Sequence, residues 1–224
     1  MEAAGVNLSQ RLKERTRELH EQAEQHPLQR ALARGELPRS AYTEFLVQML
    51  HLHRALESEL RACAGDPNLD RVVHESQFQA DNIEADLKFF GAEPRAPLSA
   101  TIQAIDMIGA MRSRSPAELL GVVYVLEGSK NGSAFLARVV RRAYGLEPST
   151  GDRFLDPHGP DQRPIWARFK ANLDAVELTP AQADGVEAAA GATFRAVTAI
   201  AQAVYTLEET DSTAGRLRSA AGTR

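Results

Sequence analysis

Cysteine is nearly absent from this sequence, because Cys63 is the only one among 224 residues. A single thiol excludes an internal disulfide, and no Cys-x-x-Cys motif is present for redox chemistry or a zinc site. Excess positive charge is also lacking, since 26 Lys and Arg stand against 30 Asp and Glu. Nucleic-acid-binding domains are usually basic, so the net charge of −4 argues against a nucleic-acid partner.

Long apolar runs are missing as well. A helix that spans a bilayer needs roughly 20 consecutive apolar residues, and no stretch here approaches that length. The first residues, MEAAGVNLSQRLKERTRE, contain no apolar core of the kind found in a signal peptide. We therefore expect a cytoplasmic protein without a membrane partner.

No segment alternates apolar and polar residues as a half-buried strand would, and the apolar residues recur instead at helical spacing. Helices are predicted at residues 8–25, 42–63, 76–90, 99–113, 116–145, 160–177 and 180–209. Two of them begin with capping-box sequences, at Ser115 and Thr179. We predict an all-α fold of about seven to nine helices in one domain, 1–209, and a disordered polar tail, 210–224.

The first predicted helix carries a stripe of charged residues around a histidine. Lys13, Arg17, His20 and Glu24 are spaced by four, three and four residues, which places them on one face. Imidazole is a common metal ligand, and Glu24 or a bridging water could orient its second nitrogen. The two cations would suit the carboxylates of a flat ligand such as haem. A solvated surface stripe beside a partly buried histidine is the alternative that spacing alone leaves open.

The stretch YVLEGSKNGSAF, residues 124–135, is unusually rich in glycine and small polar residues for its place between two apolar helical runs. Each glycine inside a helix costs about 1 kcal/mol relative to alanine. Either the stretch is a loop, or something approaches the backbone closely. If the helix is unbroken, Gly121, Gly128 and Gly132 share one face that a flat ligand can approach.

Three segments resemble the biliverdin-forming haem oxygenases. LKERTRELHEQAE, residues 12–24, is similar to the proximal-helix signature of that family. LLGVVYVLEGSKNGSAFLARVV, residues 119–140, resembles the distal helix, especially that of bacterial members that accompany phytochromes. GPDQRPIWARFKANLDAVELTPAQ, residues 159–182, resembles the segment that follows. The resemblance covers about residues 8–209.

The resemblance implies roles for the charged stripe. His20 would be the axial ligand of the haem iron, and Glu24 its neighbour. Lys13 and Arg17 match basic positions that approach the haem propionates. Lys170 matches a further basic position.

The resemblance also implies a distal wall. Gly128 and Gly132 match glycines that bring backbone over the haem, and Phe194 matches an aromatic residue near the haem edge. The sequence departs from the family in having serine after Gly132, where many members have a second glycine. It also lacks the distal aspartate of the animal enzymes, so Glu127, Ser129 or water held by backbone would replace it.

The function that the resemblance implies is cleavage of haem to biliverdin, carbon monoxide and ferrous iron, with O₂ and external electrons. A ferredoxin, a flavodoxin or a reductase would supply the electrons, and a phytochrome could accept the bilin. The basic residues Arg138, Arg141 and Arg142 predict a patch for an acidic donor. Two alternatives stay open: a non-catalytic haem binder or sensor on the same fold, and a helical enzyme acting on thiamine-like substrates.

Overall fold

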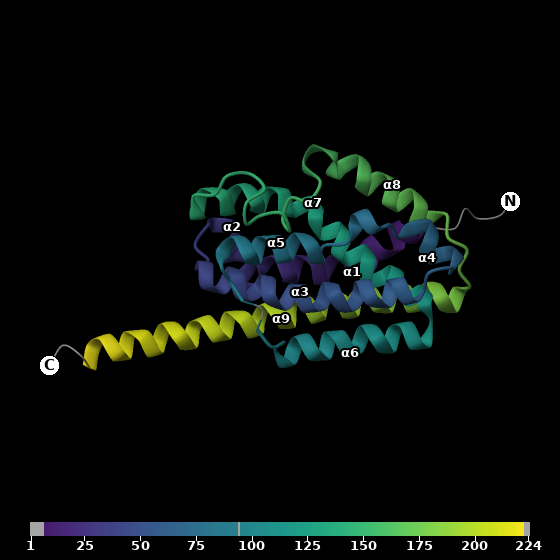
Figure 1. Cartoon of the computed structure of the whole chain (residues 1–224). Coiled ribbons are helices and arrows are strands. Elements are labelled where there is room, and N and C mark those ends of the chain that lie inside the picture. Colours follow the sequence, from purple (N-terminus) through teal and green to yellow (C-terminus); the bar gives the residue numbers. More distant parts are fainter. Residues whose placement is uncertain (1–6, 94, 222–224) are drawn as a thin grey trace.

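The computed structural model describes residues 7–93 and 95–221, with residues 211–221 as backbone only, and this part of the chain contains helices and no strand. The helices are α1 Leu8–Gln25, α2 Pro27–Arg34, α3 Arg39–Ala62, α4 Pro67–Val72, α5 Ala80–Phe90, α6 Ser99–Arg114, α7 Leu119–Tyr144, α8 Gln162–Asp174 and α9 Pro180–Ala221 (Figure 1). Short 3₁₀ turns are η1 Glu75–Gln77, η2 Pro116–Glu118 and η3 Gly159–Asp161. The all-α prediction is confirmed.

The sequence did not predict the short helices α2 and α4. Each begins with proline directly after a side chain that accepts backbone N–H groups. His26 Nδ1 accepts from Leu28 N at 3.2 Å, and the Asp66 carboxylate accepts from Asn68 N and Leu69 N, both at 3.0 Å. Helices this short have too few residues to show the helical spacing of apolar residues. The capping side chains mark where they begin.

The predicted helix 76–90 is wrong in its first turn. Residues 75–77 form η1, and α5 begins only at Ala80. The buried carboxylate of Glu57, on α3, accepts from Gln79 N at 2.7 Å and from Ala80 N at 3.0 Å. A side chain from a distant helix therefore caps α5, so local pattern could not place its start.

The two predicted capping boxes differ in outcome. At α9 the box forms, since Thr179 N donates to Gln182 Oε1 at 2.9 Å and Gln182 N donates to Thr179 Oγ1 at 3.3 Å. At Ser115 it does not, because Glu118 pairs with Arg114 at 2.6 Å and the first turn is η2. An ion pair with the preceding helix competes successfully for the glutamate.

The disordered tail 210–224 stays a prediction, and its residues 222–224 lie outside the described part of the chain. The backbone of α9 remains helical to Ala221, where the sequence predicts disorder from residue 210. In Figure 1 its last turns extend beyond the other helices. The tail holds Arg and Leu with several alanines and no proline, residues that permit a helix to continue. The domain boundary near residue 209 stays a prediction.

Helix α9 is the central support of the fold. α1, α2, α3, α6 and α7 all pack against it. The closest approach is at Gly121 of α7, where a Cβ would lie 2.2 Å from the Val186 carbonyl oxygen and 2.8 Å from Ala190 N. Backbone lies against backbone here, which only a residue without a side chain permits.

None of the helices in residues 7–93 and 95–221 combines the length and the apolar composition that crossing a bilayer would require.

Gly121→Ala should destabilise the protein by about 1–3 kcal/mol, because α7 and α9 must separate to admit the methyl group. Thermal unfolding would measure this. Gly109→Ala, in the middle of α6, is the matched control, since its Cβ would meet only Glu59 Oε1 at 3.9 Å. That control should be neutral or more stable by up to about 1 kcal/mol. Equal melting temperatures for both variants would contradict the close approach.

Burial of His53 predicts a pH-dependent stability. Burial and, to a smaller extent, the neighbouring Lys130 charge together lower the pKa of His53 from 6.5 to about 3. The unfolded chain binds a proton near pH 6.5 while the folded protein resists it, so the free energy of unfolding should fall as pH drops toward 3. The loss from this group is about 1.4 kcal/mol per pH unit.

Denaturant unfolding between pH 7 and pH 4 would measure how steeply the free energy of unfolding changes with pH. Burial raises the pKa of Asp86 to about 6, which acts in the opposite direction below that pH. Comparing the wild type with His53→Gln removes the contribution of Asp86, because that contribution is the same in both proteins. Identical slopes in the two proteins would contradict the assignment to His53.

Candidate functional site

His20 lies at the edge of the core, on α1. Leu12 and Thr16 on the same helix are buried, whereas 55% of the His20 side chain is exposed. Its Nδ1 lies 3.6 Å from Glu24 Oε1, and its ring contacts Phe194 of α9 edge-on at a centroid distance of 5.7 Å. Nε2 has no protein partner among the described residues. A carboxylate thus lies near one nitrogen, although beyond hydrogen-bond distance, and the other nitrogen is available as a ligand.

The arginines and lysine of α1 divide into two groups. Arg11 and Arg15 fasten α1 to α9 through Glu187, at 2.5 and 3.3 Å. Lys13 and Arg17 are exposed and form no ion pair with any described residue. The structure therefore places two unpaired cations beside His20, as the stripe predicts. Such cations can meet ligand carboxylates without first breaking a bond within the protein.

Helix α8 connects the two halves of the site. Its Asp174 carboxylate accepts from Ser9 N at 2.8 Å and Ser9 Oγ at 2.9 Å, which ties α8 to α1. Toward its other end, Trp166 stacks on Phe169 with centroids 5.2 Å apart. Lys170 Nζ lies 5.8 Å from the Trp166 ring centroid and makes no ion pair in the described part of the chain. Lys170 is thus available on a helix that touches α1.

Helix α7 is continuous through its glycines, which excludes a loop at residues 124–135. Its glycine face meets three different environments. Gly121 packs against α9 backbone, so the expectation that a ligand approaches there is wrong. A Cβ on Gly128 would lie 3.3 Å from the Trp166 ring, and one on Gly132 would meet no atom within 4 Å. Open space therefore borders only Gly132 of these three.

Polar side chains around the glycines bond to the helix itself. Ser129 Oγ donates to the Leu126 carbonyl at 2.8 Å, Asn131 Nδ2 to the Gly128 carbonyl at 2.9 Å, and Ser133 Oγ to the Ser129 carbonyl at 2.9 Å. Such bonds bend helices slightly. The Ser129 hydroxyl is occupied locally, and its catalytic role stays a prediction.

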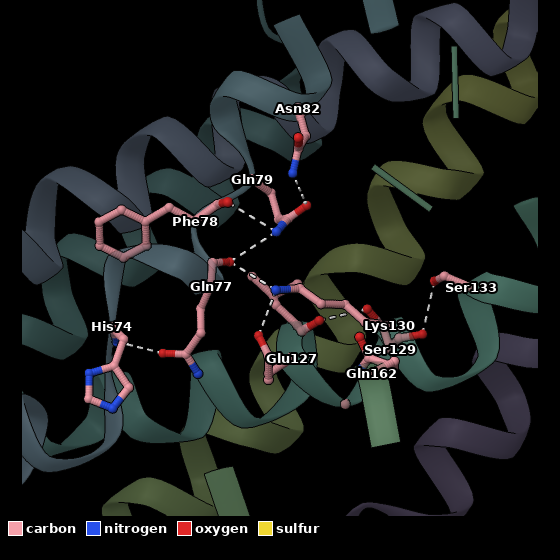
Figure 2. A network of polar contacts seen from close by, with 12 residues as sticks. His74, Gln77, Phe78, Gln79, Asn82, Glu127, Ser129, Lys130, Ser133 and Gln162 are labelled. Atoms are coloured by element: carbon pink, nitrogen blue, oxygen red, sulfur yellow. Dashed lines mark hydrogen bonds and ion pairs between the residues drawn. The ribbon is translucent and has the colours of Figure 1, made fainter. Parts of the chain in front are cut away.

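Glu127 faces the interior of the protein. It is 2% exposed and its Oε2 accepts from Lys130 Nζ at 2.6 Å (Figure 2). This side of α7 is not the one that Gly128 and Gly132 share. The geometry gives no support to the prediction that Glu127 acts directly on a ligand at the glycine face.

Two residues near the site were not singled out from the sequence. Trp166 is the only tryptophan in the chain, which was a usable signal, but its contact with Gly128 depends on how α8 folds back. Lys130 looks like an ordinary solvated lysine in sequence, although only 5% of its side chain is exposed. Burial of a lysine is uncommon and could not be foreseen from the local pattern.

Arg141 is not part of a free basic patch. Its guanidinium pairs with Asp152 and, at 2.9 Å, with Asp156, so the loop after α7 neutralises it. Arg138 and Arg142 are exposed, and neither forms an ion pair with a described residue. Two of the three predicted positions therefore remain accessible.

The fold and site define a class: an all-α protein with one available imidazole, nearby unpaired cations and a helix face poor in side chains. Comparisons with known proteins specify it further. Residues 6–203 match the family described as "Heme oxygenase". The chain belongs to the haem oxygenase family, and the predictions of family, fold and a haem oxygenase enzyme are confirmed.

The relatives are distant in sequence. A haem oxygenase from Takifugu rubripes is 25% identical over 80% of this chain and 68% of its own length. Haem oxygenase 1 from a Nostoc species is 22% identical, covering 84% and 82% of the two chains. The chain spans about two thirds of the length of the animal relatives.

A solved structure shows the same fold. Haem oxygenase-1 from the cyanobacterium Synechocystis, in complex with haem, superimposes with a TM-score of 0.86 at 18% identity. The superposition covers 96% of this chain and 99% of that one. At this identity the likeness supports the fold, and the roles of individual residues depend on the geometry described above.

Gly132→Leu separates stability from ligand access. The new side chain enters open space and gains about 1 kcal/mol of helix propensity, so the melting temperature should stay equal or rise. The same side chain should reduce haem uptake and bilin yield, because it covers the open backbone. Haem titration, product analysis and thermal unfolding measure the three quantities. Normal uptake and yield in a stable variant would show that Gly132 does not border the ligand.

Proposed function

We propose that this chain binds haem through His20 and cleaves it to biliverdin, carbon monoxide and ferrous iron. The observation that supports this most directly is the unpartnered Nε2 of His20, with Nδ1 held near Glu24 and the ring held by Phe194. Family membership supports the reaction. The residues present fit the ligand, because a neutral imidazole suits iron and the cations Lys13 and Arg17 suit propionates.

Each residue would contribute orientation or space. His20 Nε2 would bind the iron, while Glu24, whose Oε1 lies 3.6 Å from Nδ1, would approach that nitrogen and help to orient the ring. Lys13, Arg17 and Lys170 hold the carboxylates of the ligand and so set its rotation in the plane. Haem supplies the iron that activates O₂ and is itself the molecule oxidised.

The distal side contributes by what it lacks. At Gly132 no side chain fills the space above the helix, so O₂ and water can enter. The described glycine face presents no acid–base side chain of its own, since Glu127 points to the interior. Backbone groups and water would then provide the hydrogen bonds that the animal enzymes obtain from aspartate.

Electron transfer requires an external donor. We propose an acidic ferredoxin, flavodoxin or reductase that meets Arg138 and Arg142, and a cytoplasmic location. A bilin-accepting phytochrome is the proposed recipient of the product. These partners rest on the resemblance to bacterial members of the family and on the exposure of the two arginines.

His20→Ala tests the proposal. The variant should fold, because the side chain is more than half exposed, but it should lose the haem Soret spectrum of the wild type and nearly all bilin formation. Added imidazole should restore part of both. His51→Ala is the control and should behave as wild type, because this histidine on α3 bonds through Nε2 to the Arg95 carbonyl at 2.7 Å.

An unchanged spectrum in His20→Ala would mean that another residue binds the iron. A wild-type protein that binds haem with an intact spectrum, yet forms no bilin with reductant and O₂, would instead favour the non-catalytic haem binder.

A further inference from the structure

Lys130 lies midway between the two glycines at the candidate site, and its side chain points the other way. Successive helix positions differ by 100°, so residue 130 is about 200° from both 128 and 132. The exposed fractions agree, because Lys130 is 5% exposed while a Cβ on Gly132 would meet open space. The lysine therefore occupies the back of the segment whose front is open at Gly132.

The ammonium group joins α7 to a different part of the chain. Lys130 Nζ donates to Glu127 Oε2 at 2.6 Å and to the Gln77 carbonyl oxygen, in η1, at 2.9 Å (Figure 2). Burial lowers the pKa of Lys130, and the adjacent Glu127 carboxylate opposes this effect. The bond to Gln77 spans 53 residues of sequence, so it is a tertiary contact rather than a helix-stabilising pair alone.

Gln77 is itself held in place. Its Oε1 accepts from His74 N at 2.6 Å, and its carbonyl oxygen also accepts from Gln79 Nε2 at 3.2 Å. Gln79 N in turn donates to Glu57 Oε1 on α3 at 2.7 Å. A continuous set of hydrogen bonds thus leads from α7, through η1, to α3.

The pair also borders a small interior cavity of about 20 Å³, large enough for one water molecule. His53, Glu57, Gln77, Glu127 and Lys130 contribute to its wall. The second carboxylate oxygen of Glu127, Oε1, is buried and has no protein partner among the described residues. Leu56, Leu60, Val73, Phe78, Val123 and Leu126 complete the wall, so the Lys130 ammonium depends on Glu127 and the Gln77 carbonyl for its polar partners.

The segment that Lys130 holds is weak as a helix. Two glycines within five positions lower its propensity, and the hydroxyl and amide groups of Ser129, Asn131 and Ser133 bond to its carbonyls. A helix of this composition needs tertiary contacts to keep one position. Trp166 lies against Gly128 on one face, and the bond from Lys130 to Gln77 restrains the segment from the face opposite Gly132.

We infer that Lys130 is a positioning residue: by tying α7 to Gln77, it fixes how far the open backbone at Gly132 stands from the bound haem. This inference rests on the proposed function, since it concerns the same site. Lys130 does not touch the ligand in this arrangement. Its loss should change where the macrocycle is attacked and how rigid the segment is, rather than abolish iron ligation.

The test uses a neutral double variant, Glu127→Gln with Lys130→Met. Removing one charge alone would leave the other buried without a partner and destabilise the whole fold, whereas removing both avoids that cost. Lys88→Met, at an exposed position on α5, is the matched control for the loss of one lysine.

The first measurement is amide hydrogen exchange in the haem-free proteins. In the double variant, the amides of residues 128–133 should exchange about tenfold faster or more, which corresponds to about 1.4 kcal/mol of lost protection. Amides in α6 should be unchanged, and so should all amides of Lys88→Met. Unchanged exchange at residues 128–133 in the double variant would overturn the inference.

The second measurement is the distribution of biliverdin isomers formed from the four meso carbons, together with the haem dissociation constant. The double variant should keep the Soret spectrum of the wild type and give a broader isomer distribution. Faster exchange with an unaltered isomer distribution would show that the restraint does not position the site and would overturn the inference. A wild-type protein that takes up no haem would refute the proposed function, and exchange alone would then decide whether Lys130 restrains α7.

Discussion

The contact between Gly121 and the backbone of α9 sets the geometry on which the rest of the structure depends. Two helices approach so closely there that a Cβ would lie 2.2 Å from a carbonyl oxygen. Repacking of side chains therefore can hardly change the position of α7 relative to α9. Because α9 also carries Phe194, which contacts His20, the same helix supports both sides of the candidate site.

The proximal side is secured by ion pairs that leave its functional groups free. Arg11 and Arg15 bind Glu187, while Lys13 and Arg17, on the same helix as His20, pair with none of the residues that the structure describes. α8 then closes the arrangement, since Asp174 bonds to Ser9 of α1 and Trp166 lies against Gly128 of α7. The candidate site thus lies among helices that contact one another directly.

The distal side must satisfy two opposing requirements. Access for O₂ and haem needs a helix face without side chains, but a glycine-rich helix holds its position poorly. The buried pair of Glu127 and Lys130 lies on the opposite face, where it reaches Gln77. Support of the helix therefore comes in part from the face opposite its open surface.

The sequence by itself determined the helical class, the approximate extent of the long helices, and the stripe that joins His20 to two cations, because helical periodicity is a local property of the chain. It could not place the start of α5, which a carboxylate of α3 caps, nor distinguish the three glycines of α7. Only the tertiary structure decided that Gly121 meets backbone, that Gly128 meets Trp166 and that Gly132 borders open space. It likewise decided that Glu127 and Lys130 are buried together. Residues on one helix face share a direction, but what they meet depends on neighbours that are distant in the chain.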